Sequence, residues 1–195
     1  MKDKLTSKER RQVEWLSNGS KLVESIAVAS MKLRKLRAGK LPRKFLYRSY
    51  EEFFLRHGRL FKPHPFLLKY RKWRGKPKAC LYNAVELALS SELDYVEGYA
   101  LPAKGLQLPM PHSWCVDGEG KVVDPTWHKV VGREYFGLAL DKGILREQHQ
   151  RGLPFGLLFN EGLFQNIASG KIKDWRKWLA KRRYPHALMA QERDH

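Results

Sequence analysis

The sequence predicts an α+β domain in which a small antiparallel sheet packs against a helix that begins at Cys80. Residues 80–89 place apolar side chains along one wide face, as a helix packed on a core does. Residues 95–126 combine strand-like alternation with glycine- and proline-rich turns. Basic residues are concentrated on both sides of this centre, so we expect basic helices to flank it.

Residues 1–56 are predicted to form a basic helical region. Two helices within 7–37 are expected to separate near Asn18, with Ser20 as the N-cap of the second. Lysines and arginines cover one face of that second helix, and this face is either solvated or a binding surface. An aromatic segment, 43–56, is expected to add a short helix.

Residues 57–159 are predicted to form the core domain, which begins with a loop over 57–78. Aromatic and basic side chains alternate in this loop. They either stack on nucleic-acid bases and contact phosphates, or anchor the loop while the charges face water. Gly98, in the middle of a predicted strand, indicates a bulge or a close approach between backbones. Beyond the helix at 80–89, we expect strands over 95–101, 112–117, 121–126 and 133–140, and a helix over 141–150.

Residues 160–195 are predicted to form a basic helical tail. Helices are expected over 160–169 and 174–183, the second with tryptophans on one side and lysines and arginines on the other.

The loop of the predicted hairpin fixes the pairing of its two strands. A three-residue loop that ends in a left-handed glycine, here Gly120, pairs Asp117 with Lys121. Counting back from that pair places His112 and Asp124 on the same face of the hairpin. A two-residue loop would place them on opposite faces. The same count turns Cys115 away from both.

Three residues of the central block have the types and the order of a thiol-based catalytic triad. We expect Cys80 to be the nucleophile, His112 the general base and acid, and Asp124 the carboxylate that orients the imidazole. Cys80 lies in the first turn of its helix, where the helix dipole favours the thiolate. Trp114 is expected to form a wall of the substrate site. The backbone N–H of Cys80 would serve as one oxyanion donor, and the candidates for a second are Tyr70, Trp73 and Asn83.

No metal and no cofactor are expected. A metal site built from Cys80, His112, Cys115 and His128 is the weaker interpretation, because His112 and Cys115 point to opposite faces. The chain also has no Cys-x-x-Cys spacing of the kind that zinc sites use.

The motifs of the central block resemble the transglutaminase-like branch of the papain-like cysteine protease superfamily. The matching positions are Cys80 at a helix start, His112 with Trp114, and the Asp-Pro-Thr run at 124–126. The block is also similar to small phage-encoded proteins with Cys-x-x-Asn-Ala, Tyr-Val-Glu-Gly-Tyr-Ala and Asp-Pro-Thr-Trp motifs. This resemblance covers residues 80–127 and implies a papain-like core that acts on a peptide or acyl substrate as a protease, amidase, deamidase or transglutaminase. Transglutaminases usually place Trp after the nucleophile, whereas Leu81 stands here, which argues against transfer to lysine.

The charge distribution supports a second function class. The formal net charge is +18, and residues 56–78 hold 9 basic and no acidic side chains, whereas residues 80–162 hold 7 basic and 11 acidic. Basic flanks favour contact with nucleic acid or another acidic partner. The alternative is therefore a nucleic-acid- or ribosome-associated protein, such as a phage accessory or virion protein, on an inactive papain-like scaffold.

The expected location is the cytoplasm, or the host cytoplasm if the protein is phage-encoded, with no membrane contact. Two cysteines give no disulfide framework. No apolar run near residue 1 has the length of a signal peptide or a membrane span.

Overall fold

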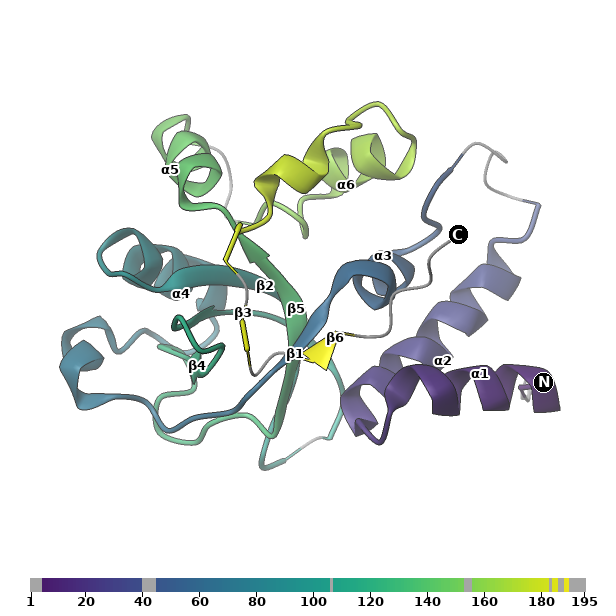
Figure 1. The fold of residues 1–195 in the computed structure, drawn as a ribbon, viewed down its shortest axis with the longest axis horizontal. Helices are drawn as coiled ribbons and strands as arrows, with labels where there is room; N and C mark the ends of the chain where they lie inside the picture. Colours follow the sequence, from purple (N-terminus) through teal and green to yellow (C-terminus); the bar gives the residue numbers. More distant parts are fainter. Residues whose placement is uncertain are drawn as a thin grey trace.

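A six-stranded antiparallel sheet, ordered β4-β3-β2-β5-β1-β6, forms the centre of the protein and is covered by helices (Figure 1). The computed structural model describes residues 5–39, 45–105, 107–152, 156–182, 184–185 and 188–189. The strands are β1 (Arg59–Phe61), β2 (Asp94–Leu101), β3 (Met110–Val116), β4 (Val122–Val123), β5 (Glu134–Leu140) and β6 (Leu188–Met189). The helices are α1 (Ser7–Ser17), α2 (Lys21–Leu36), α3 (Tyr50–His57), α4 (Cys80–Leu89), α5 (Lys142–Gln150) and α6 (Glu161–Ala168), with 3-10 turns at Leu68–Trp73 and Trp175–Trp178. The predicted α+β class with an antiparallel sheet is confirmed.

The sheet curls until its two sides meet. An isolated bridge joins Lys62, directly after β1, to Lys121, directly before β4. Its hydrogen bonds run from the Lys62 N–H to the Gly120 carbonyl (3.2 Å) and from the Val122 N–H to the Lys62 carbonyl (2.9 Å). Because β4 lies at one edge of the sheet and β1 near the other, this contact gives the sheet a concave and a convex face.

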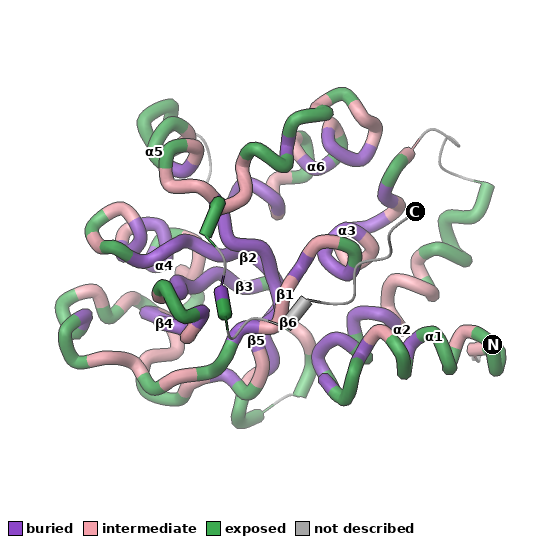
Figure 2. Tube along the Cα trace, in the orientation of Figure 1, coloured by how far each residue is buried: buried purple, intermediate pink, exposed green. Residues whose placement is uncertain are grey.

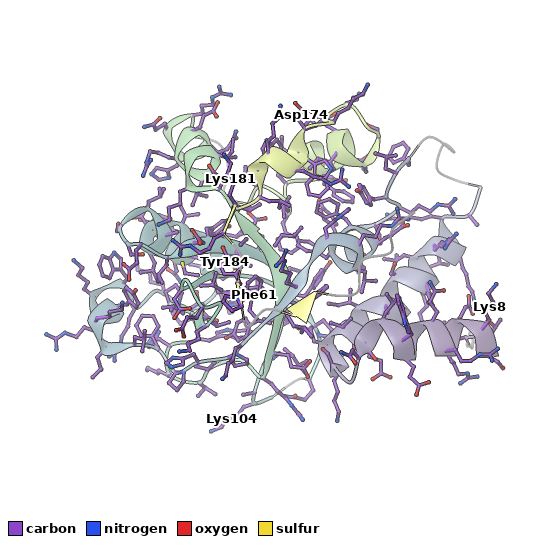
Figure 3. The ribbon with its side chains drawn as sticks, viewed as in Figure 1. Lys8, Phe61, Lys104, Asp174, Lys181 and Tyr184 are labelled. Carbon is purple, nitrogen blue, oxygen red and sulfur yellow. The ribbon has the colours of Figure 1, made fainter. Side chains whose placement is uncertain are left out.

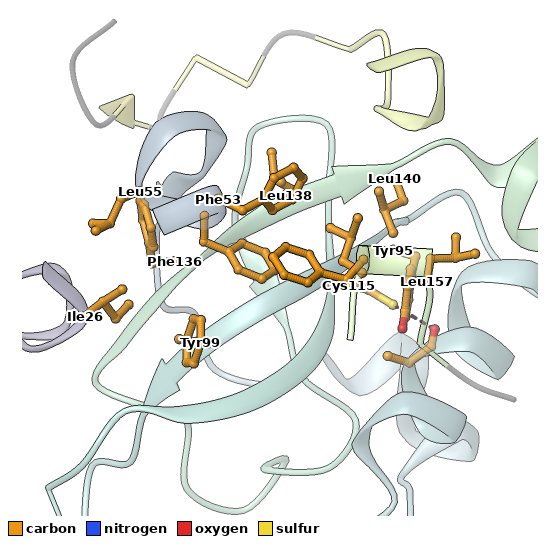
Figure 4. Close-up of a cluster of buried hydrophobic side chains, with 14 of the residues drawn as sticks. Ile26, Phe53, Leu55, Tyr95, Tyr99, Cys115, Phe136, Leu138, Leu140 and Leu157 are labelled. Carbon is orange, nitrogen blue, oxygen red and sulfur yellow. Dashed lines mark hydrogen bonds between the residues drawn. The ribbon is translucent and has the colours of Figure 1, made fainter. Parts of the chain in front are cut away.

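Each face of the sheet covers its own hydrophobic core. On β2, Val96 and Ala100 face the smaller core inside the curl, together with Trp114 and Tyr135 from the neighbouring strands. The main core lies on the convex face, between the sheet and the helices, and Figure 4 shows Tyr95, Phe136 and Leu138 within it. The burial pattern in Figure 2 agrees, because buried backbone follows the sheet while the outer turns of the helices are exposed.

The break predicted between the first two helices is confirmed. Asn18 adopts a left-handed conformation at φ 42°, and it ends α1. The Ser20 hydroxyl accepts the Val23 N–H at 3.1 Å and caps α2. The apolar face of α2 then enters the main core, through Leu22 and Ile26 among others.

Three parts of the fold differ from the sequence prediction. The strand expected over 121–126 is only β4, Val122–Val123, because the backbone turns where Asp124 accepts the N–H groups of Thr126 and Trp127. The loop expected over 57–78 contains β1, a strand too short to show alternation. The helix expected over 174–183 is wrong in its described part, where only a single 3-10 turn forms. The physical reason is that the following backbone pairs with β5: the Ala180 N–H donates to the Ala139 carbonyl at 3.0 Å. β1 reaches only Gly137 on β5, so the end of β5 is left for this segment.

The chain beyond that segment closes the smaller core. The Tyr184 ring lies 5.6 Å from Phe61 edge-to-face, and the two side chains are neighbours in Figure 3. The Tyr184 hydroxyl donates to Asp94 Oδ2 at 2.9 Å. Residues from all three predicted regions, 1–56, 57–159 and 160–195, therefore contribute to the packing around one sheet. None of the helices in the described part of the chain is long and apolar enough to cross a membrane.

Gly98 lies at a close approach between the backbones of β2 and β5. A Cβ atom at this position would come within 2.2 Å of the Phe136 carbonyl oxygen and 2.4 Å of the Gly137 Cα. Both of these are backbone atoms of a central strand, which cannot move aside as a flexible side chain can.

We expect Gly98→Ala to lower the free energy of unfolding by about 3 kcal/mol or more, because the added methyl overpacks two paired strands. Urea unfolding would measure the change. Gly118→Ala is the matched control, since its Cβ would meet only Arg182 Nη1, at 3.6 Å. Equal stability of the two variants would contradict the close approach.

Candidate active site

Cys80 is the first residue of α4, and its thiol is the accessible member of the predicted site. The preceding residue, Ala79, provides no side-chain cap, so the first-turn N–H groups remain available. The backbone N–H groups of Ser113 and Leu81 both act to lower the pKa of the Cys80 thiol. Cys80 is partly exposed, and the helix N-terminus therefore presents a thiol to solvent.

The predicted hairpin register is confirmed. Gly120 is left-handed at φ 83°. The Asp117 N–H donates to the Lys121 carbonyl at 3.1 Å, and Val116 pairs with Val122. The side chains predicted to share a face do meet: His112 Nε2 lies 2.8 Å from Asp124 Oδ2. The loop chemistry at Gly120 was sufficient to predict this contact.

Asp124 is buried and accepts four hydrogen bonds. Oδ2 accepts from His112 Nε2 and, at 2.9 Å, from the Tyr135 hydroxyl. Oδ1 accepts the N–H groups of Thr126 and Trp127, both at 2.9 Å. Burial acts to raise the pKa of Asp124, but the charge of His112 and these donors outweigh it, so the pKa is lowered and the carboxylate is ionised.

The contact with Asp124 defines the state of the His112 ring. A carboxylate accepts hydrogen bonds, so Nε2 carries a proton and the interaction with the Cys80 side chain falls to Nδ1. Burial acts to lower the pKa of His112, but Asp124 and then Cys80 overcome it and raise the pKa to about 9. The imidazole is therefore protonated at neutral pH.

The Cys80 thiol is affected in the complementary direction. Burial acts to raise its pKa, but the hydrogen bond and the charge of His112 lower it below the ordinary value, with help from the two backbone N–H groups. A lowered thiol pKa beside a raised imidazole pKa favours a thiolate–imidazolium pair. That pair is the reactive state of a cysteine nucleophile.

Trp114 does not wall the site as predicted. It is completely buried in the smaller core, with its ring 5.1 Å from Tyr135. Trp127 instead covers the imidazole, at a ring distance of 4.1 Å and an interplanar angle of 17°. Trp127 is only partly buried, so it is the tryptophan that can contact a bound molecule. Trp127 is far from His112 in the sequence, so the residue pattern did not predict this contact.

Cys115 is the inert member of the cysteine pair. It is fully buried on the convex face, and its thiol donates to the Ala84 carbonyl at 3.2 Å. Burial raises its pKa well above the ordinary value. His112 and Cys115 lie on opposite faces of β3, and no three His, Cys, Asp or Glu side chains of the described chain are arranged to hold a metal ion.

The loop before Cys80 is tied to the loop after Asp124. The Asn83 amide donates to the Lys76 carbonyl at 2.8 Å and to Thr126 Oγ1 at 2.9 Å. The Gly75 N–H donates to the Pro125 carbonyl at 2.8 Å. These bonds fix the position of the nucleophile relative to Asp124.

Two of the residues predicted as a second oxyanion donor already donate hydrogen bonds to other groups. Asn83 uses its amide protons on Lys76 and Thr126, and the Tyr70 hydroxyl donates to Glu92. These donors are therefore engaged elsewhere. Trp73 lies under Lys72, whose Nζ is 4.1 Å from the ring centroid. The backbone N–H of Cys80 lies at the uncapped start of α4 and stays a candidate oxyanion donor.

A second buried carboxylate, Glu97, was not predicted to matter for the site. It accepts the N–H groups of Leu157 (2.6 Å), Leu158 (2.8 Å) and Phe159 (3.1 Å) and the Tyr95 hydroxyl (3.0 Å). A Cβ added to Gly156 would lie 3.5 Å from Leu81, so this loop packs beside the residue that follows the nucleophile. Glu97 thus positions one border of the site.

No protein-family model, curated protein or solved structure matches this chain. The interpretation of the site therefore depends on its geometry.

We expect iodoacetamide to modify Cys80 and spare Cys115 in the folded protein. Alkylation of Cys80 should begin below the ordinary thiol pKa of about 8.5, because the thiolate forms as the pH rises through a lowered pKa. In His112→Asn, alkylation of Cys80 should begin at higher pH. Burial still raises the pKa of the thiol in this variant, and the imidazolium no longer lowers it. Peptide mass spectrometry across a pH series measures both. Equal labelling of the two cysteines would contradict the assignment.

We expect Asp124→Asn to lower the pKa of His112 from about 9, because the carboxylate that most strongly opposes the effect of burial is removed. NMR titration of labelled histidine measures this, with the His112 signal assigned by its loss in His112→Asn. The raised pKa stabilises the fold fully below about 6.5, and this stabilisation is lost as the pH rises through about 9. Asp117→Asn removes the same charge from the hairpin without touching His112 and should leave its pKa near 9; a similar fall there would argue against a direct effect.

Proposed function

We propose that the protein is a cysteine-dependent hydrolase or acyl transferase that acts on an amide or a thioester. The observation that carries the proposal is the buried His112–Asp124 hydrogen bond together with Cys80, a partly exposed cysteine whose pKa is lowered by His112. Each member has the ionisation state that its role requires. The order of nucleophile helix, histidine strand and aspartate loop around an antiparallel sheet supports a papain-like core.

The reaction would proceed in two steps. The Cys80 thiolate attacks the carbonyl carbon and forms an S–C bond, and the tetrahedral oxyanion faces the N–H of Cys80. The C–N or C–S bond to the leaving group then breaks as the imidazolium of His112 gives the leaving group its proton. Water, or an acceptor amine or thiol, then attacks the thioester carbon and passes its proton back to His112. The S–C bond to Cys80 breaks, which releases the acyl product and restores the thiolate beside the imidazolium. Asp124 stays ionised and stabilises the imidazolium in both steps.

The charge beside the nucleophile favours an acidic substrate. Arg74, Lys76 and Lys78 precede Cys80 and are exposed, and Lys78 is held in a left-handed conformation at φ 64°. The acidic residue that pairs with this loop, Glu92, is engaged by Lys69 at 3.0 Å. An acyl donor with negative groups would therefore meet an attractive field as it approaches the thiol.

The test is to trap the acyl intermediate on Cys80. The protein is incubated with thioester and activated amide donors that carry acidic, neutral or basic acyl groups, and adducts are located by mass spectrometry. We expect adducts on Cys80, formed fastest with acidic donors, with a loss of about 1000-fold or more in rate in His112→Asn. Cys115→Ser, which keeps a donor for the Ala84 carbonyl, is the control and should react normally. A folded protein that forms no adduct on Cys80 with any donor would overturn the proposal.

A further inference from the structure

The chain that leads into the nucleophile carries a dense run of cations. The loop between β1 and α4 lies beside α4, at the end of the molecule away from α1 and α2 (Figure 1). Its last part, residues 71–78, holds five basic side chains and no acidic one, and all five are exposed: Arg71, Lys72, Arg74, Lys76 and Lys78. Within the described part of the chain none of the five forms an ion pair. We call the last three, Arg74, Lys76 and Lys78, the cationic strip.

The backbone of the strip is held in place while its side chains are exposed. The Gly75 N–H donates to the Pro125 carbonyl at 2.8 Å. The Asn83 amide accepts the Lys76 N–H at 3.3 Å and donates to the Lys76 carbonyl at 2.8 Å. Gly75 also lies directly against α4, because a Cβ added to it would come within 2.0 Å of Asn83 Cγ. The strip thus presents its charges from a fixed backbone, which reduces the entropy that is lost when a partner binds.

Lys78 is held in a conformation that favours glycine. It follows Pro77 in a turn and has a φ of 64°, a left-handed value of the kind that type II turns require and that glycine adopts without strain. The other left-handed non-glycine residue among the described ones is Asn18, and asparagine tolerates this conformation better than lysine does. Lys78 lies two positions before Cys80. Strain that is retained beside a reactive group indicates that the side chain serves the site.

The thiol decides which kind of polyanion suits the strip. A nucleic acid would match the charges, but its phosphate backbone offers no acyl carbon for Cys80 to attack. An acidic polypeptide offers both amide carbonyls and carboxylates. An extended polypeptide places alternate side chains on one side, about 7 Å apart, so several carboxylates can face the strip while the backbone passes the thiol.

We propose that the site acts on an acidic polypeptide segment and that Lys78 is the residue that determines this specificity. This inference rests on the proposed thiol chemistry. The ammonium group of Lys78 binds a carboxylate close to the scissile bond, and Lys76 and Arg74 bind carboxylates farther along the substrate. The field of the strip also speeds the approach of an acidic substrate, because no carboxylate of the described chain pairs with these cations.

The main test compares two peptide thioesters of equal length, one with glutamates and one with glutamines on both sides of the thioester. Mass spectrometry follows the rate at which each peptide forms an adduct on Cys80 at low salt. We expect the glutamate peptide to react at least about tenfold faster than the glutamine peptide in the native protein.

Two triple variants of equal charge show where this preference arises. In the strip variant, Arg74→Gln/Lys76→Gln/Lys78→Gln, the ratio of the two rates should fall below about threefold. The control, Arg10→Gln/Arg11→Gln/Lys21→Gln, removes the same charge from exposed positions of α1 and α2 and should keep the native ratio.

Changes at Lys78 alone separate specificity from stability. Lys78→Gly and Lys78→Ala should each lower the rate ratio by about threefold or more, whereas Lys78→Arg keeps the charge and should retain the ratio. Lys78→Gly should also raise the urea midpoint above that of Lys78→Ala, because glycine adopts a φ of 64° without strain. A loss of preference in the more stable of these two variants cannot come from a damaged fold.

Protection from alkylation tests the strip without thioester chemistry. Unreactive polyglutamate should slow the modification of Cys80 by iodoacetamide in the native protein, and added salt should remove this protection. If polyglutamate protects Cys80 but no thioester acylates it, the thiol chemistry is overturned and the strip stands as a binding surface for acidic peptides.

Three results would overturn the assignment of specificity to the strip. One is equal reaction of the two peptides in the native protein, which would leave the thiol chemistry intact. Another is an equal fall of the rate ratio in the strip variant and in its control. The third is stronger protection of Cys80 by oligothymidylate than by polyglutamate of the same charge, which would identify a nucleic acid as the partner. If the triple strip variant does not fold, the single changes at Lys78 decide the result.

Discussion

The buried contact between His112 and Asp124 is the constraint on which the rest of the candidate site depends. A charged pair in a protein interior loses its hydration, and it is tolerated only when its remaining hydrogen-bonding positions are filled. Here the carboxylate accepts four hydrogen bonds, one from His112 and three from other donors. Two of those donors are backbone N–H groups of Thr126 and Trp127. The hydrogen bonds that the buried carboxylate requires therefore fix the path of the loop that follows it.

That loop transmits the constraint to the nucleophile. Thr126 accepts from Asn83 on α4, and Asn83 in turn holds the backbone at Lys76, just before Cys80. Trp127 covers the imidazole ring. A continuous set of hydrogen bonds therefore connects the orienting carboxylate to the start of the helix, which explains how residues from a helix, a strand and a loop can be held in one arrangement.

Buried carboxylates organise both faces of the sheet. Asp124 faces the smaller core inside the curl, whereas Glu97 lies on the convex face and binds the loop at 157–159. Carboxylates of α1 and α3 instead pair at the surface, where Glu9 binds Lys35 and Glu52 binds Arg56.

Features that depend on neighbouring residues could be predicted from the sequence. Asn18 and Ser20 end one helix and cap the next, and Gly120 sets the hairpin register that joins His112 to Asp124. These are local because turn and cap hydrogen bonds span only a few residues. Two contacts could be recognised only in the folded chain: Trp127 covers the imidazole of His112, and the Tyr135 hydroxyl donates to Asp124. Those contacts depend on the strand order and on the curl of the sheet, and both arise from long-range burial rather than from spacing along the chain.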